Sequence, residues 1–513
     1  MRKALLSLLA IGLLFGVSSI QKTITSDRDR LGLTLVQPLE NAPPVLAFTT
    51  VALGGFRGLI SNALWIRAND LQDNDKFFEM AQLADWITKL EPHYTQVWVV
   101  QAWNMAYNIS VKFSEFPDRW RWVDRGIRLL RDEGLRYNPN DILIYAELSW
   151  FFQHKMGANL DDANMYYKRQ WLGEMQKVFG KTTPNLDELV HPQTLEQSNR
   201  VSVLRNEFKM DPNLMKEVDE RYGPLEWRLP EAHAIYWAYL GLKAAETNPT
   251  KVKKDDLINV YRRIYQSMQL AFQRGRLIVN PYLVEGKPAF EFGPNLDIIP
   301  QTSAAYERAA KEDAEMRDHI FKAHRNFLRD AVYFLYGHNR VADASHWFNY
   351  LGTKYPDKML INGDTNSFPG HITLDQYAFA RIQEDVGEAN SDDRVKAAVE
   401  GLVKQSYVAL ALGQDQRAAG FKLMANLLIT TFKSNVGERI IALPMPSVEE
   451  VQKNVLKELL DPEKGPPYEF RSALRYKLGM PGEPPPSSST NAPPERASSS
   501  SSSFSSSKSP GKS

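Results

Sequence analysis

The nine histidines of this 513-residue chain are the residues most able to bind a metal ion. His319 and His324 lie five positions apart on one predicted helix, with the carboxylates of Glu312, Asp313 and Glu315 nearby. Metal-binding helices place two histidines four positions apart on one face, whereas a spacing of five turns them away from each other. No HExxH motif occurs, and the chain has no cysteine. We therefore expect a solvated, charged helix face, with no bound metal and no cofactor.

Other catalytic signatures are also missing from the sequence. The Gly-Lys-Ser of Gly511–Ser513 ends a Ser-rich tail and opens no helix, as a phosphate-binding loop must. Asp161 and Asp162 fall at the start of a predicted helix, where negative charge favours the positive end of the helix dipole. The isolated His233 is predicted to be a hydrogen-bonded core residue. The sequence thus predicts a protein that is not an enzyme.

Composition narrows the possible partners. The net charge is +1, and acidic and basic residues are interspersed along the chain. A nucleic-acid binder usually carries a basic stripe, so no nucleic-acid partner is expected. Hydrophobic residues make up 43% of the chain, which is enough to bury a sizeable core.

The first twenty residues predict export. A basic pair at residues 2–3 precedes an apolar run from Ala4 to about Ile20, the layout of a signal peptide or an uncleaved signal anchor. Val17 and Ser19 could serve as the −3 and −1 positions of a cleavage site, but the usual alanine pair is missing. We expect a periplasmic or cell-envelope protein whose N-terminus anchors it to the cytoplasmic membrane, and the alternative of cleavage stays open.

The segment 326–356 predicts two short amphipathic helices closed by Pro356. Its small and apolar positions are Leu328, Ala331, Val332, Leu335, Ala344 and Phe348. Three segments repeat this pattern earlier in the chain, at 61–94, 95–141 and 142–179, and a degenerate copy lies at 399–432. Small residues fall where the two helices of each hairpin should cross, and these are Ala68, Ala102, Ser149, Ser406 and Ala418.

These residue positions resemble the tetratricopeptide repeat (TPR). A TPR hairpin cannot bury its apolar face alone and must stack on its neighbours. The resemblance, to exported bacterial proteins with TPR-like repeats, implies an all-α fold of stacked helical hairpins, a TPR-like α-solenoid. It also implies a non-catalytic scaffold or adaptor of the bacterial cell envelope that binds a protein partner.

In TPR proteins, partners usually bind the concave face, lined by positions 2, 5, 9 and 12 of each first helix. On the hairpin at 326–356, these positions are Asn326, Arg329, Tyr333 and Tyr336, a polar strip in which arginine could hold a carboxylate. The alternative is that this strip packs against a neighbouring helix. On the second and third hairpins, the same positions include Trp103 and Trp150 on largely apolar faces, which favour a partner helix or burial by a later domain.

The predicted divisions of the chain are a signal segment (1–25), N-terminal repeats (45–180), an insertion and helical linker (181–302), a C-terminal TPR-like region (303–440), C-terminal helices (441–478) and a disordered tail (479–513). We expect one short helix within 181–224, a short strand pair near 289–292, and a helix that Ser447 caps. The Ser/Pro-rich tail lacks the apolar residues that ordering requires.

Two other functions remain open at this stage. One is an envelope enzyme whose site lies within 181–302. The other is a carrier that holds a small apolar ligand inside the helical curve.

Overall fold

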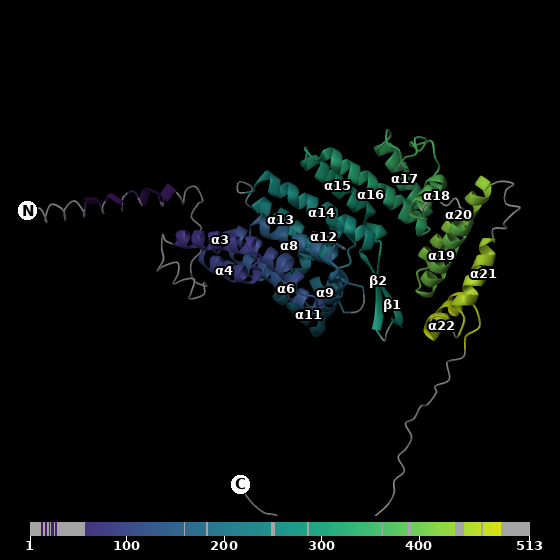
Figure 1. Cartoon of the computed structure of the whole chain (residues 1–513), viewed down its shortest axis with the longest axis horizontal. Coiled ribbons are helices and arrows are strands. Elements are labelled where there is room, and N and C mark those ends of the chain that lie inside the picture. The colour runs from purple at the N-terminus through teal and green to yellow at the C-terminus, as the bar shows by residue number, and fades with distance from the viewer. Residues whose placement is uncertain are drawn as a thin grey trace, which may run out of the picture. The chain divides into compact units, whose positions relative to one another are not determined.

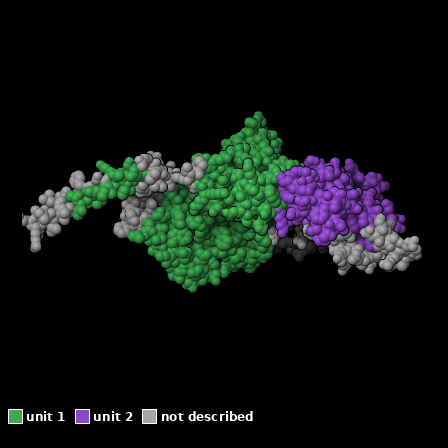
Figure 2. Space-filling model, turned by 90° about the horizontal axis from the view of Figure 1, so that it is seen from above, with its two compact units in different colours: residues 1–276, 297–321 green, residues 277–296, 322–513 purple. Residues whose placement is uncertain are grey.

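The computed structural model describes residues 57–483, apart from 159, 181–182, 248–251, 285–286, 362, 387–391, 437–445 and 463–464, together with scattered residues between 12 and 27. The chain forms two compact units, coloured separately in Figure 2. Unit 1 comprises residues 1–276 and 297–321, and unit 2 comprises residues 277–296 and 322–513. Most of the predicted signal segment and of the predicted tail lies outside the described residues.

The secondary structure of the described residues is almost entirely helical, which confirms the all-α class (Figure 1). The sheet among them has two strands, β1 (Arg276–Val284) and β2 (Lys287–Gly293); β2 covers the predicted segment 289–292, and β1 precedes it. The helices of unit 1 are α3 (Arg57–Asp73), α4 (Phe77–Leu90), α5 (Thr95–Trp103), η3 (Asn104–Ile109), η4 (Ser110–Lys112), α6 (Phe116–Arg128), η5 (Leu129–Gly134), α7 (Leu135–Tyr137), α8 (Ile142–Trp150), η6 (Phe151–Gly157), α9 (Asn164–Phe179), α10 (Leu186–Val190), α11 (Leu195–Glu207), α12 (Pro212–Tyr222), α13 (Pro230–Thr247), α14 (Lys254–Arg274), η8 (Leu296–Ile298) and α15 (Ile299–Glu312).

Unit 2 holds the two strands and the later helices. These are α16 (Arg317–Gly337), whose first turn still belongs to unit 1, α17 (Val341–Lys354), α18 (Leu374–Val386), α19 (Asp392–Ala411), α20 (Asp415–Val436), α21 (Val448–Leu459) and α22 (Tyr468–Lys477). Ser447 caps α21 in a capping box with Glu450, as its position before two glutamates predicts.

The first part of unit 1 consists of three pairs of consecutive helices. They are α3 with α4, α5–η3 with α6–η5, and α8–η6 with α9. Helix α4 packs on α5, and α5 packs on α8, so neighbouring pairs touch through their helices. Asp141 starts the third pair, because its carboxylate accepts the backbone N–H of Leu143 at 2.9 Å.

Small residues allow the helices of a pair to approach closely. In the second pair, Ala102 is fully buried, and a Cβ atom added to Gly126 would lie 2.9 Å from the carbonyl oxygen of Ala102. In unit 2, Ser406 of α19 donates its hydroxyl to the carbonyl oxygen of Ala418 on α20 at 2.7 Å. Ala102, Ser406 and Ala418 therefore lie at helix contacts, as their spacing predicts.

The prediction of one short helix within 181–224 was wrong, because this region forms α10, α11 and α12. Each helix begins at a side-chain cap, from Asn185, Thr194 and Asp211. The polar composition of this segment conceals helices whose ends are fixed by local hydrogen bonds rather than by a strong apolar pattern.

Candidate functional site

In the second and third helix pairs of unit 1, the first helix of the pair changes from α-helical to π-helical winding directly after a tryptophan. Helix α5 ends at Trp103 and continues as the π-helical η3, and α8 ends at Trp150 and continues as η6. In an α-helix, side chains four positions apart diverge by about 40°, and the wider π-turn brings them closer to alignment. Such turns are rare and often mark functional sites.

This winding stacks one aromatic ring on the next in both helices. The rings of Trp103 and Tyr107 are 4.7 Å apart at 18°, and those of Trp150 and His154 are 4.1 Å apart at 15°. The Tyr107 hydroxyl lies 3.2 Å from His154 Nδ1 and joins the two stacks. We call Trp103, Tyr107, Trp150 and His154 the aromatic strip. The structure thus brings the two predicted tryptophans into one continuous feature.

Arg263 of α14 covers one end of the aromatic strip. Its guanidinium carbon lies 3.7 Å from the centroid of the Trp150 ring, a close cation–π contact. No side chain among the described residues accepts a hydrogen bond from this guanidinium, and its buried Nε has no partner there. At the other end, Trp103 keeps 41% of its surface exposed.

A pocket of about 460 Å³ lies beside the aromatic strip. Its lining consists of Tyr107, Val111, Arg119, His154, Lys155, Leu160, Asp161 and Asp162. At its base, Lys155 Nζ is 2.6 Å from Asp161 Oδ2, and both side chains are at least nine-tenths buried. Asp161 also accepts the backbone N–H of Ala163 at 2.9 Å, close to the start of α9. Ion pairs and the edges of the aromatic strip therefore surround the pocket.

The environment fixes the charge of these groups at neutral pH. Burial, together with the charges of Arg263 and Lys155, lowers the pKa of His154, so this ring is neutral. Burial also lowers the pKa of Lys155, against the opposing effect of Asp161. Burial alone would raise the pKa of Asp161, but the hydrogen bond and charge of Lys155 and the N–H of Ala163 hold it below its usual value.

Glu147 lies one turn before Trp150 on α8, inside the same region. Burial raises its pKa to about 7, although the charge of Arg263 opposes this shift. Its Oε1 is buried and has no hydrogen-bond partner among the described residues. Glu147 is therefore close to its protonation midpoint at neutral pH.

The predicted polar strip of the hairpin at 326–356 is not an open surface in unit 2. Asn326 is exposed, but Arg329 and Tyr336 are only 3% and 2% exposed. Helix α18 covers this face, because Tyr336 donates its hydroxyl to Asp375 at 2.8 Å and Tyr377 donates to the backbone oxygen of Arg329 at 3.0 Å. Arg381 of α18 also lies 5.5 Å from the centroid of the Tyr333 ring. The sequence alternative, packing against a neighbouring helix, describes these residues better than partner binding.

Sequence reasoning missed Tyr107, His154, Lys155, Asp161 and Arg263 as parts of the site. A signal for the first two is present, since both tryptophans are followed four positions later by another ring. Lys155 and Asp161 pair across a loop, and Arg263 arrives from a helix more than one hundred positions away. Spacing alone does not reveal such contacts.

Two of the remaining candidates for chemistry, His233 and His324, are core residues, whereas His319 is exposed. His233 is fully buried, and its Nε2 lies 2.9 Å from the carbonyl oxygen of Trp227, as a hydrogen-bonded core histidine requires. Burial lowers its pKa to about 4 and raises the pKa of the neighbouring Glu231. His324 is also buried, with Nδ1 2.8 Å from the Tyr355 hydroxyl, and Asp313 is 3% exposed. The expectation of a solvated helix face was therefore wrong for these two residues, because each is enclosed by a hydrogen-bond partner from another segment.

Within the described part of the chain, no cluster of three or more histidines and carboxylates could bind a metal ion. None of the described helices is both long enough and apolar enough to cross a membrane. Comparison with protein-family models, curated proteins and solved structures finds no match to this chain.

Proposed function

We propose that this chain is a non-catalytic scaffold or adaptor that binds a protein partner through the aromatic strip. The observation that carries the proposal is that the Trp103 end of the strip is exposed, while Arg263 covers the Trp150 end. Trp103 remains 41% exposed while its ring is held against Tyr107. Tryptophans of this kind dominate binding energy at protein interfaces. A ring that is already fixed also loses little conformational entropy when a partner covers it.

A TPR-like stack of the three N-terminal helix pairs is the frame of this proposal. Contacts between successive pairs and the close approach at Ala102 and Gly126 support it. In a stack of repeats, equivalent helices form one continuous surface, on which a partner can contact several repeats at once. The aromatic strip crosses two such helices, α5–η3 and α8–η6.

The charge of the region indicates what kind of protein segment would fit. The strip offers the exposed ring of Trp103 at one end, and the guanidinium of Arg263 places a positive charge against Trp150 at the other end. A partner segment would therefore place an apolar side chain on Trp103 and an acidic side chain near Arg263. A second acidic group would be disfavoured close to Glu147 whenever that carboxyl is ionised.

The cell envelope is the proposed location. The basic pair at residues 2–3 and the apolar run that follows support export and an N-terminal membrane anchor. The alternative functions gain no specific support. The pocket beside the strip combines apolar side chains with the ion pair of Lys155 and Asp161, and the perturbed groups Glu231 and His233 are enclosed in the core.

Site-specific photo-crosslinking of the full-length chain in intact cells tests this proposal. A photoreactive phenylalanine at position 103 should capture a distinct protein, and the same residue at position 86 should not. Trp86 is a suitable control because it is also an exposed tryptophan, at 48%, but lies on α4, outside the strip. Equal capture from both positions, or capture from neither, would count against binding at the strip.

A further inference from the structure

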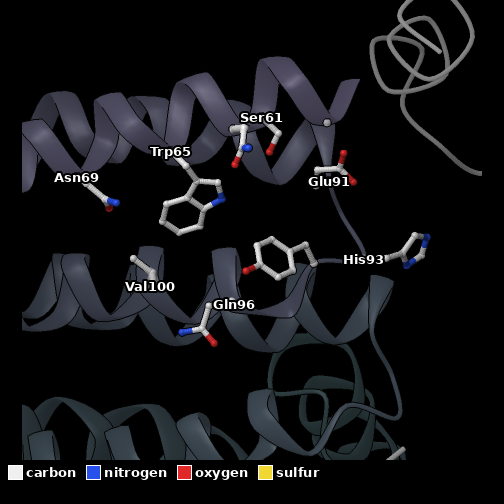
Figure 3. Close-up of a pocket in the computed structure, with 10 residues that line it drawn as sticks. Ser61, Trp65, Asn69, Glu91, His93, Gln96 and Val100 are labelled. Atoms are coloured by element: carbon white, nitrogen blue, oxygen red, sulfur yellow. The ribbon is translucent and has the colours of Figure 1, made fainter. Parts of the chain in front are cut away.

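A second open site lies in unit 1, between the first helices of the first and second helix pairs. The groove between α3 and α5 has a volume of about 730 Å³, within the usual range of ligand sites. Figure 3 shows Trp65 and Asn69 projecting from α3 toward α5, with Val100 projecting from α5 toward them. The full lining is Gly58, Ser61, Asn62, Trp65, Asn69, Glu91, His93, Tyr94, Gln96 and Val100.

The polar groups on the two helices of this groove are uncharged. Asn62 and Asn69 lie on α3, two helical turns or about 10.5 Å apart along the axis, and Gln96 lies on α5. All three carboxamides are exposed, and none is tied to another described side chain. A carboxamide both donates and accepts hydrogen bonds. The groove can therefore bind groups that do the same, without neutralising a charge.

The aromatic residues of the groove form a corner rather than a straight channel. The rings of Trp65 and Tyr94 are 6.5 Å apart and meet at 75°. The indole Nε1 of Trp65 has no hydrogen-bond partner among the described residues, so no polar contact fixes this ring to a neighbouring helix. A saturated ring in the chair form can pack its C–H face on the indole while the phenol closes one side.

Charged groups lie only at one end of the groove, in the loop between α4 and α5. Figure 3 places Glu91 and His93 there, away from Asn69. His93 is directed toward Tyr137, with Nδ1 3.0 Å from its carbonyl oxygen. An acidic ligand would meet the carboxylate of Glu91 and gain no cation from the groove walls.

We propose that this groove binds a neutral saccharide chain. A sugar ring combines a C–H face, which the aromatic corner accepts, with hydroxyls that donate and accept, which the carboxamides match. An extended peptide also carries donors and acceptors, but its side chains alternate in direction and need a straight channel with separate pockets. The proposal is separate from partner binding at the aromatic strip, since it depends on Trp65, Asn69 and Gln96.

Calorimetric titration of the full-length chain with cellohexaose, chitohexaose and maltohexaose tests the inference. At least one of these neutral sugars should bind with a dissociation constant below about 1 mM. Asn69→Ala and Gln96→Ala should each weaken binding about 3- to 10-fold through the lost hydrogen bonds, and Trp65→Ala should weaken it more. Gln72→Ala is the matched control, because Gln72 is an exposed carboxamide on α3 outside the groove lining.

The other arms distinguish the alternatives. The Trp103→Ala variant should retain saccharide binding even where partner binding fails, which separates the two proposals. A capped neutral peptide, acetyl-(Gly-Ser)₃-amide, should not bind. The inference is overturned if none of the three sugars binds, if the peptide binds as well as the best sugar, or if Gln72→Ala weakens binding as much as Asn69→Ala.

Discussion

Substitution of Asp161 by asparagine should show how strongly the base of the site is held together. The side chain of Lys155 is 4% exposed and that of Asp161 is 10% exposed, with 2.6 Å between Nζ and Oδ2. Asp161→Asn keeps the shape of the side chain but leaves the buried ammonium without its counter-charge. Removing one partner of a buried ion pair typically costs about 3–5 kcal/mol, so we expect a loss near 3–4 kcal/mol.

The adjacent Asp162 provides the matched control. Its side chain is 68% exposed, although the side chain of its ion-pair partner Arg119 is only 14% exposed. Solvent screens the exposed Asp162 carboxylate, and Arg119 keeps Asp161 as a partner at 3.4 Å, so Asp162→Asn should cost no more than about 1 kcal/mol. The two substitutions alter the same chemical group at neighbouring positions, and the difference between them reports the buried contacts of Asp161 with Lys155, Arg119 and the N–H of Ala163.

Hydrogen exchange of the helix α9 (Asn164–Phe179) is the appropriate assay, because a chain with two compact units need not unfold in one step. A loss of 3–4 kcal/mol corresponds to exchange that is about 10²- to 10³-fold faster. The pKa of Asp161 is lowered in the fold, so the contribution of its charge is present above its ordinary pKa of 3.8 and is lost as the pH falls through the folded pKa. Equal, small effects of Asp161→Asn and Asp162→Asn at neutral pH would refute the reasoning.

Two further predictions concern protonation and helix packing. The pKa of Glu147 is raised from 4.5 to about 7, so the stability of α8 should fall as the pH rises through this range. Relative to Glu147→Gln, the fall should reach up to about 3 kcal/mol by hydrogen exchange of α8, and parallel pH profiles of the two proteins would contradict this. Gly420→Ala should destabilise α20 by about 2 kcal/mol, because the added Cβ overlaps the backbone of Gly337. Gly401→Ala should stabilise α19 by about 0.5–1 kcal/mol, because no atom lies within 4 Å of the added Cβ. Hydrogen exchange should therefore become faster in α20 of Gly420→Ala and slower in α19 of Gly401→Ala.

Much of the local structure could be predicted from the sequence, because it depends on short-range signals. Ser447 before two glutamates predicts the start of α21. The turn after α19 contains Gly413, whose φ of 73° is a conformation that glycine adopts without steric cost. The periodic spacing of apolar residues predicts the paired helices at 61–94, 95–141 and 142–179. Apolar residues at this spacing lie on one face of a helix, and that face is the one that packing buries.

The site was only partly predictable, because it depends on contacts between distant segments and on unusual helix winding. Trp103 and Trp150 could be identified as surface candidates, but the π-turns that stack them on Tyr107 and His154 have no simple sequence signal. The opposite error occurred at Tyr336, where the position within the repeat suggested an open face. Helix α18 packs on that face and covers it. The sequence pattern of α18 predicts a helix but does not say against which surface the helix packs.

The most direct test of partner binding at the aromatic strip compares the wild-type protein with Trp103→Ala. The quantity measured is the affinity of each for the protein that crosslinks at position 103. Tryptophan buries about 150–250 Å², and the 41% that is exposed here corresponds to about 60–100 Å², or roughly 1.5–2.6 kcal/mol on contact. The account predicts that Trp103→Ala weakens binding about 10- to 80-fold, while Trp86→Ala leaves it unchanged. Unchanged affinity in a folded Trp103→Ala protein, or equal losses in both variants, would contradict it.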